Sequence, residues 1–163
     1  MGVINLNSSD ISSISSLAKE VWPVAYGEIL SSKQLQYMLN AFYSANSLQE
    51  QMQKGHLFYG LKENDKLIAF IAVEANFPEI NTTKIHKLYV SPDQQGRQFG
   101  KNLIDFVSQL VLKMGQSKLL LNVNRFNSAQ YFYTKIGFSI TKEEDIEIGQ
   151  GYLMEDFVME KTL

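Results

Sequence analysis

The chain has 163 residues, of which 45% are hydrophobic and 20% are charged, and its net charge is −2. This length and composition predict one folded domain over residues 1–163, exclude a disordered chain and argue against a general nucleic-acid binder. The chain contains no cysteine, which excludes disulfides, thiolate metal sites and a cysteine nucleophile, and we expect no metal.

The first residues carry neither a basic region nor a long apolar run, so no secretory signal is expected. The longest apolar runs in the chain are too short to cross a bilayer. The sequence therefore predicts a cytoplasmic protein without a membrane partner.

Three helices are predicted to follow a short strand at residues 3–6. The first has its apolar residues on one side, and Pro23 is expected to bend or end it. The second begins near Ser32. The third is expected to start at Ser47-Leu48-Gln49-Glu50, which has the pattern of a capping box.

Strand-forming residues recur in six further segments, at residues 57–62, 67–75, 85–90, 119–124, 138–148 and 152–160. Two more helices are predicted, one on each side of the segment at 119–124. This order of elements implies an α/β fold in which a mixed sheet has helices on both faces.

A glycine-bearing loop, Ser91 to Gly100, connects a predicted strand to the helix that begins at Lys101. Such a loop presents free backbone N–H groups and the positive end of a helix dipole, an arrangement that binds phosphate. The pattern is neither a Walker loop nor the dinucleotide G-x-G-x-x-G. Taken alone, it is also compatible with an ordinary strand-to-helix connection.

A second informative stretch follows the segment at 119–124. It predicts a turn and a short helix with Ala129, Phe132, Tyr133 and Ile136 on one side. Gly137 is then expected to end this helix in the left-handed conformation.

Three motifs in the second half of the chain, at residues 88–92, 95–100 and 127–138, resemble those of the GNAT superfamily of acyl-CoA N-acyltransferases. Their order and spacing match the family pattern. The resemblance implies a twisted, mostly antiparallel sheet of about seven strands flanked by helices. It also implies that acetyl-CoA is the co-substrate and that the acetyl group passes directly to a primary amine.

The resemblance places the cofactor on one strand, on the loop after it and at the start of the short helix. The residues implied are Leu88, Tyr89, Val90, Gln95, Gly96, Arg97, Gln98, Phe99, Gly100, Lys101, Asn127 and Ala129. One departure from the family pattern is Gln98, which stands where glycine is usual. If that position needs a positive φ, we expect a strain of about 1 kcal/mol there.

Tyr133 occupies the position of the family's general acid, and a phenol can protonate the departing thiolate; a core tyrosine is the alternative. His86 stands where family members often place a glutamate, and an imidazole is suited to accept a proton near neutral pH. A structural histidine is the alternative there. The base could equally be water relayed from His86, Glu28 or Glu74.

The family builds part of its acceptor site from the early helices, which implies Trp22, Tyr26 and Glu28 as substrate-binding residues; core packing is the alternative for Trp22. The acidic residues Glu28, Glu155 and Asp156 are suited to hold a polyamine. The end of the chain is similar to bacterial members described as diamine or polyamine acetyltransferases.

Three functions are compatible with these patterns. The first is acetylation of a small-molecule amine or polyamine. The second is acetylation of a protein N-terminus or lysine, for which an open acceptor cleft would be expected. The third is a non-catalytic CoA-binding regulatory module. The resemblance also allows a homodimer.

Overall fold

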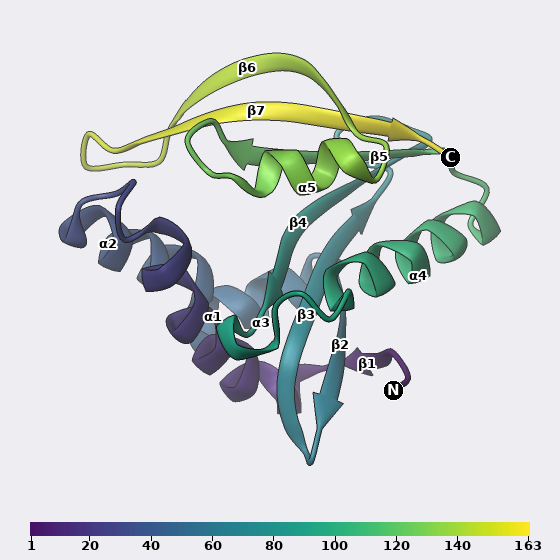
Figure 1. Ribbon diagram of the computed structural model, residues 1–163, viewed down its shortest axis with the longest axis horizontal. Helices are drawn as coiled ribbons and strands as arrows, with labels where there is room; N and C mark the ends of the chain where they lie inside the picture. Colours follow the sequence, from purple (N-terminus) through teal and green to yellow (C-terminus); the bar gives the residue numbers. More distant parts are fainter.

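The computed structural model describes residues 1–163 and contains one seven-stranded sheet (Figure 1). The strands lie in the order β1-β2-β3-β4-β5-β7-β6, and all neighbours are antiparallel except β4 and β5. Their bounds are β1 Ile4–Leu6, β2 Leu57–Glu63, β3 Lys66–Ala75, β4 Thr82–Val90, β5 Lys118–Asn124, β6 Ser139–Glu147 and β7 Leu153–Thr162. The predicted mixed, mostly antiparallel sheet is confirmed.

Five α-helices cover the two faces of this sheet. They are α1 Ile11–Tyr26, α2 Ser32–Tyr43, α3 Ala45–Gln53, α4 Phe99–Lys113 and α5 Ala129–Lys135. Helices α1, α2 and α3 share one hydrophobic cluster with the sheet, and α4 and α5 share a second. The sheet therefore has a separate core on each side.

Strand β3 holds the two cores together because both of its faces are buried. Residues 67–73 form an unbroken apolar run, and every one of them is at most 4% exposed. Phe70 and Ala72 belong to the α1–α3 core, whereas Ile71 and Val73 belong to the α4–α5 core. A continuous apolar run is expected for a strand covered on both faces.

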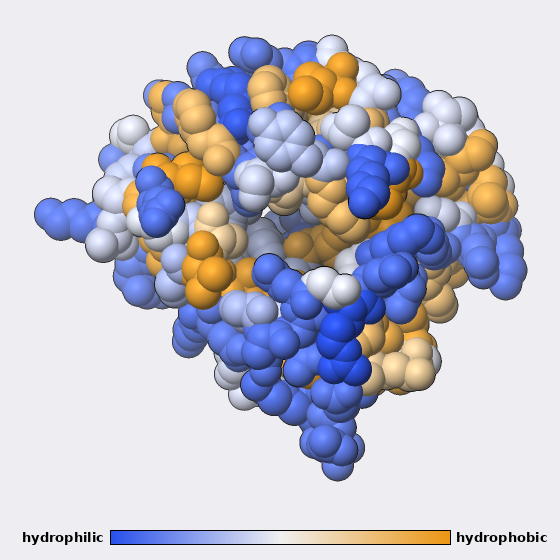
Figure 2. Space-filling model, viewed as in Figure 1, coloured by the Kyte–Doolittle hydropathy of each residue, from blue (hydrophilic) through white to orange (hydrophobic).

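The parallel pair β4 and β5 separates part-way along its length. Pairing runs from Thr82 with Lys118 to Ile85 with Leu121 and then stops. Figure 1 shows β5 turning away from β4 beyond this point, and Figure 2 shows the surface hollowed in the same region, below α5. The backbone of residues 86–90 therefore has no strand partner on the β5 side.

Strand β4 contains a β-bulge at His86. Lys87 pairs with Ala72 and Ile85 pairs with Val73, so His86 has no partner residue on β3. A bulge shifts the alternation of side chains, and Ile85 and Leu88 consequently pack in the same core. The bulge turns the side chain of His86 toward Glu74.

Two details at helix ends differ from the sequence prediction. The capping residue of helix α3 lies three residues before the predicted one, because Ser44, not Ser47, accepts the N–H of the third residue after it. Helix α1 does not end at Pro23 but continues to Tyr26. Gly137 adopts a φ of +105° after α5, as predicted. No helix is both long and apolar enough to cross a membrane.

Helix α2 is tied to the turn between β6 and β7. The hydroxyl of Tyr37 donates to the carbonyl of Ile148 at 2.6 Å, and Nε2 of Gln34 donates to the carbonyl of Leu153 at 2.9 Å. The ring of Tyr37 also lies 5.2 Å from that of Tyr152. These contacts close one end of the space between α1–α2 and the β6–β7 hairpin.

Candidate active site

The loop between β4 and α4 leaves several consecutive backbone N–H groups free. None of Gln95, Gly96, Arg97 and Gln98 donates its backbone N–H to another residue, and the first bond of α4 runs from Asn102 N to Gln98 O at 2.9 Å. The first turn of α4 carries no acidic side chain. Free amides at a helix N-terminus form an anion site, so this loop can hold a pyrophosphate.

Gln98 adopts the left-handed conformation, with φ of 62° and ψ of 16°. The position usually held by glycine therefore does need a positive φ in this chain, and a residue with a Cβ is strained there by about 1 kcal/mol. Gly96, at φ +83°, is the other left-handed residue of the loop.

Side chains around the loop are already engaged within the protein. The Arg97 guanidinium lies 3.4 Å from Glu63 Oε1 and 4.9 Å above the ring of Phe99. Lys101 Nζ pairs with Asp105 at 2.6 Å. A phosphate contact from Arg97 or Lys101 would exchange these exposed ion pairs, which are weak in water.

Asn127 and Tyr26 meet beside β4. Asn127 Oδ1 accepts the N–H of Ala129 at 2.9 Å, so the backbone amide of Ala129 is not free. Burial raises the pKa of the Tyr26 phenol, and polar contacts with Tyr89 and Asn127 oppose the rise. Residues predicted for the cofactor and for the acceptor thus converge where β4 and β5 separate.

Tyr133 lies on α5 with its ring between Phe132, at 5.3 Å, and Phe138, at 5.8 Å. Its hydroxyl makes no hydrogen bond within the protein. Burial raises the pKa of Tyr133, and the neighbouring Tyr26 phenol adds to the rise. The phenol is therefore protonated at neutral pH.

His86 and Glu74 form a hydrogen-bonded pair, with 2.8 Å between Nε2 and Oε2. A carboxylate oxygen only accepts, so Nε2 carries the proton and Nδ1 carries a lone pair. Burial lowers the pKa of His86 to about 4 against the opposing bond from Glu74, so the imidazole is neutral. Two of the bases considered from the sequence are therefore hydrogen-bonded to each other.

A second histidine, which the sequence patterns did not reveal, completes this group. His56 Nε2 lies 3.2 Å from the same Glu74 oxygen, and its ring stacks on that of His86 at 4.4 Å. His56 precedes β2 in a segment without a recognisable motif, and only the pairing of β2, β3 and β4 brings it here.

Asp156 is a buried carboxylate on β7, 3% exposed. It accepts a hydrogen bond from Asn122 Nδ2 at 3.2 Å, and no cationic nitrogen lies within 4.0 Å of its side chain. Burial raises its pKa, while Asn122 and the more distant Lys84 oppose the rise. The charge of Asp156 also contributes to the raised pKa of Tyr26, so this carboxylate, which has no salt bridge, lies near the same region.

Two of the predicted acceptor residues are not placed as expected. Trp22 is 4% exposed and packs against Tyr26, Tyr43 and Tyr89, so its side chain belongs to the core. Glu28 is exposed in the connection between α1 and α2 and makes no ion pair. Tyr26 is the one of the three that lies among the other site residues.

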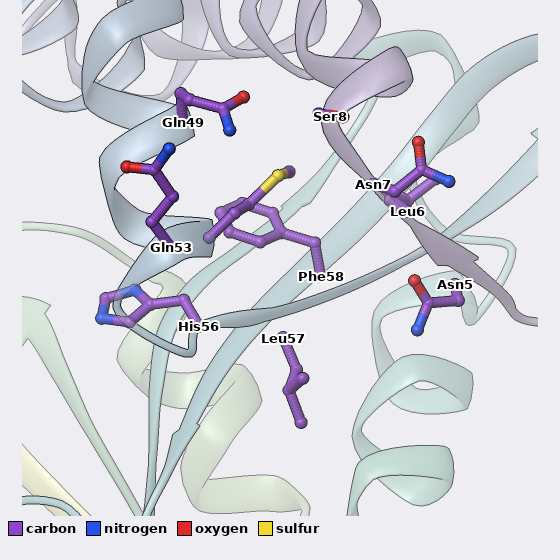
Figure 3. Close-up of a pocket in the computed structure, with 10 residues that line it drawn as sticks. Asn5, Leu6, Asn7, Ser8, Gln49, Gln53, His56, Leu57 and Phe58 are labelled. Carbon is purple, nitrogen blue, oxygen red and sulfur yellow. The ribbon is translucent and has the colours of Figure 1, made fainter.

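A cavity of about 300 Å³ lies elsewhere, between β1, α3 and β2 (Figure 3). Asn5 and Asn7 line one end of it and His56 the other. None of the residues predicted from the sequence lines this cavity. Its lining contains no residue of the β4–α4 loop, but through His56 it adjoins the Glu74–His86 pair.

A family model described as acetyltransferase (GNAT) domain matches residues 28–161. The chain belongs to the GNAT acetyltransferase family. This membership confirms the predictions of the fold, of an N-acetyltransferase and of acetyl-CoA as co-substrate.

Three known proteins illustrate the similarity. The spermidine N(1)-acetyltransferase of Thermoplasma acidophilum is 26% identical over 162 residues, which are 96% of this chain and 93% of that protein. The crystal structure of the PaiA N-acetyltransferase from T. acidophilum in complex with coenzyme A has a TM-score of 0.80 at 27% identity, with all of both chains covered. The ribosomal protein bS18-alanine N-acetyltransferase of Haemophilus influenzae is 27% identical over 110 residues, 68% of this chain and 70% of that protein.

Replacing Gln98 with glycine should relieve the backbone strain at that position. We expect Gln98→Gly to raise the free energy of unfolding by about 0.5–1 kcal/mol, measured by urea denaturation. Gln95→Gly is the matched control, because Gln95 has a φ of −66° and glycine there only adds flexibility to the unfolded chain. Equal losses of stability in both variants would contradict the strain.

Proposed function

We propose that this protein acetylates a primary amine of a small polycationic molecule by direct attack on acetyl-CoA in a ternary complex. The observation that carries the choice of substrate is the buried carboxylate of Asp156, which forms no salt bridge and lies near enough to Tyr26 to raise its pKa. A second ammonium group of the substrate would pair with this carboxylate. The spermidine N(1)-acetyltransferase of T. acidophilum, similar over nearly the whole chain, supports the same class of acceptor.

The donor would lie where β4 and β5 separate. The backbone of Leu88 and Val90 would pair with the pantetheine amides as an added strand would. The free N–H groups of residues 95–101 would take the pyrophosphate. In this arrangement Asn127 lies beside the thioester end, where its Nδ2 atom can donate.

The base of the proposed reaction is His86. Its Nδ1 atom would take the proton from the amine as the nitrogen attacks the thioester carbonyl, and Glu74 would stabilise the imidazolium through the bond at 2.8 Å. A histidine oriented by a carboxylate is a common general base.

The acid is Tyr133. When the carbon–sulfur bond breaks, negative charge develops on the sulfur, and the Tyr133 hydroxyl has no competing partner within the protein. A phenol with a raised pKa is a weaker acid than a thiol. We therefore expect it to stabilise the thiolate by a hydrogen bond, with protonation completed as the product leaves.

Acetylation of a protein N-terminus is the second candidate, because the bS18-alanine N-acetyltransferase of H. influenzae is similar over two thirds of this chain. The contacts between α2 and the β6–β7 turn favour a small acceptor. These contacts close one end of the space between α1–α2 and the β6–β7 hairpin, where the acceptor would enter. A peptide chain would need more room there than a small amine does.

The first prediction concerns the cofactor loop. Acetyl-CoA should raise the melting temperature by mass action, and Gly100→Asp should remove most of that shift by placing a negative charge at the pyrophosphate. Gly100→Ala is the control. A Cβ there would lie 3.5 Å from Phe132, an ordinary contact, so the alanine variant should keep the shift. An unchanged shift in the aspartate variant would place the pyrophosphate elsewhere.

The second prediction concerns the acid and the base. Tyr133→Phe and His86→Gln should each lower kcat by roughly 10²–10⁴-fold, the usual scale of acid–base assistance. Because neither change touches the loop, the thermal shift with acetyl-CoA should persist in both variants. Turnover at the wild-type rate in either variant would show that the substituted residue has only a structural role.

The third prediction concerns the acceptor and tests the function itself. CoA release should be measured with a monoamine, a diamine, spermidine and a peptide with an N-terminal alanine, and kcat/KM should be greatest for the polyamine. Asp156→Asn should lower that value roughly 10- to 100-fold, as expected for loss of a charged hydrogen bond, and should affect the monoamine much less.

Glu155→Gln is the matched control, because Glu155 is half exposed and lies 3.8 Å from Arg125. It should leave the preference for polyamines unchanged. A preference for the peptide would instead support the second candidate.

A further inference from the structure

The chain has two histidines in all, and both contact the same carboxylate oxygen. His56 comes from the turn before β2, Glu74 from the end of β3 and His86 from the bulge of β4. The two imidazole rings are parallel, with an angle of 7° between their planes. Three segments that are distant in sequence thus place two nitrogen donors and one oxygen donor together.

We propose that His56, Glu74 and His86 form a binding site for a divalent transition metal ion, with Zn²⁺ the best fit. Two imidazole nitrogens and one carboxylate oxygen are a common set of zinc ligands, and a water molecule would complete four-coordination. The missing cysteines exclude thiolate sites only. The added ion would regulate the enzyme, and acetyl transfer by His86 does not use it.

The distances between the donor atoms suit such an ion. The three ligand atoms lie within 4.8 Å of one another, with 2.8 Å and 3.2 Å from Glu74 to the two histidines. Tetrahedral zinc with bonds of about 2.0–2.1 Å places its ligands roughly 3.3 Å apart. Because each nitrogen lone pair lies in the plane of its ring and the two rings are stacked nearly parallel, ion binding also requires the imidazoles to rotate until both Nε2 atoms point at the ion.

The cluster is accessible to an ion. The side chains are 14%, 24% and 20% exposed for His56, Glu74 and His86, so an ion can reach them from solvent. Binding requires each imidazole to carry its proton on Nδ1.

Two features limit the affinity. The lysines Lys54, Lys84 and Lys87 exert a positive potential on the histidines, which opposes a cation. Nδ1 of His56 is buried without a hydrogen-bond partner, whereas the second nitrogen of a metal-bound histidine usually has one. The site therefore binds more weakly than a closed structural zinc site and releases the ion to a chelator.

Occupancy would inhibit acetyl transfer, because the ion holds the carboxylate and the imidazole of the proposed base pair. This consequence rests on the proposed function, whereas metal binding itself does not. Metal binding and the inhibition of acetyl transfer can be measured separately.

Binding is tested with Co²⁺, whose four-coordinate complexes absorb visible light. Chelator-treated protein, without acetyl-CoA or amine, should develop a saturable absorption band at one ion per chain, and Zn²⁺ should abolish it. His56→Gln and Glu74→Gln should each lose the band. Glu79→Gln, which changes an exposed carboxylate in the β3–β4 turn, should keep it.

The glutamine that replaces His56 can still donate to Glu74, so this variant should fold, which circular dichroism verifies. No band in the native protein, or an undiminished band in folded His56→Gln, would overturn the proposal. CoA release in the presence of chelator tests the function independently. If the native protein both binds the metal and acetylates amines, Zn²⁺ should inhibit it at a lower concentration than is needed to inhibit the His56→Gln variant.

Discussion

The separation of β4 from β5 is the constraint on which the rest of the site depends. The two strands are the parallel pair of the sheet, and their hydrogen bonds end after four residue pairs. A fully paired strand would satisfy its backbone groups within the sheet and leave none for a ligand. Here the unpaired stretch leads directly into the loop with free amides, so both parts of the proposed cofactor site follow from one interruption of the sheet.

The same separation brings side chains from opposite ends of the sequence together. Tyr26 ends α1, Asn127 precedes α5 and Asp156 belongs to β7, yet all three lie around β4. The charge balance of this region is uneven. Arg125 makes its ion pairs with the exposed acids Asp145 and Glu155, and the side chain of Asp156 forms no salt bridge. Lys84 and Arg125 oppose the cost of burying this carboxylate only from a distance, and a close cationic ligand would lower that cost.

The fold and the loop could be predicted because local sequence determines them. Neighbouring residues alone determine three of these features. They are the alternation of apolar and polar residues along the strands, the left-handed glycine after α5 and the strand–loop–helix unit at residues 85–115. The predicted strain at Gln98 is also present, since its φ is positive. The start of α3 was predicted wrongly, because Ser44 and Ser47 are both acceptable caps and only tertiary packing chooses between them.

The group of His56, Glu74 and His86 could not be predicted as a unit. It depends on the register of three strands and on a bulge that reverses the side-chain direction at one residue, and sequence spacing encodes neither. The sequence left two roles open for Trp22 for a related reason, and the structure places its side chain in the core. An aromatic residue on an amphipathic helix has the same pattern whether it lines a pocket or fills the core.

The burial of Trp22 nevertheless has a practical consequence. It is the chain's one tryptophan, and its ring lies 4.6 Å from Tyr26 and 6.1 Å from Tyr89 on β4. Its fluorescence therefore comes from a single position beside the unpaired part of β4. Any occupant of that region would alter the emission of the whole protein, so the native chain carries its own optical reporter.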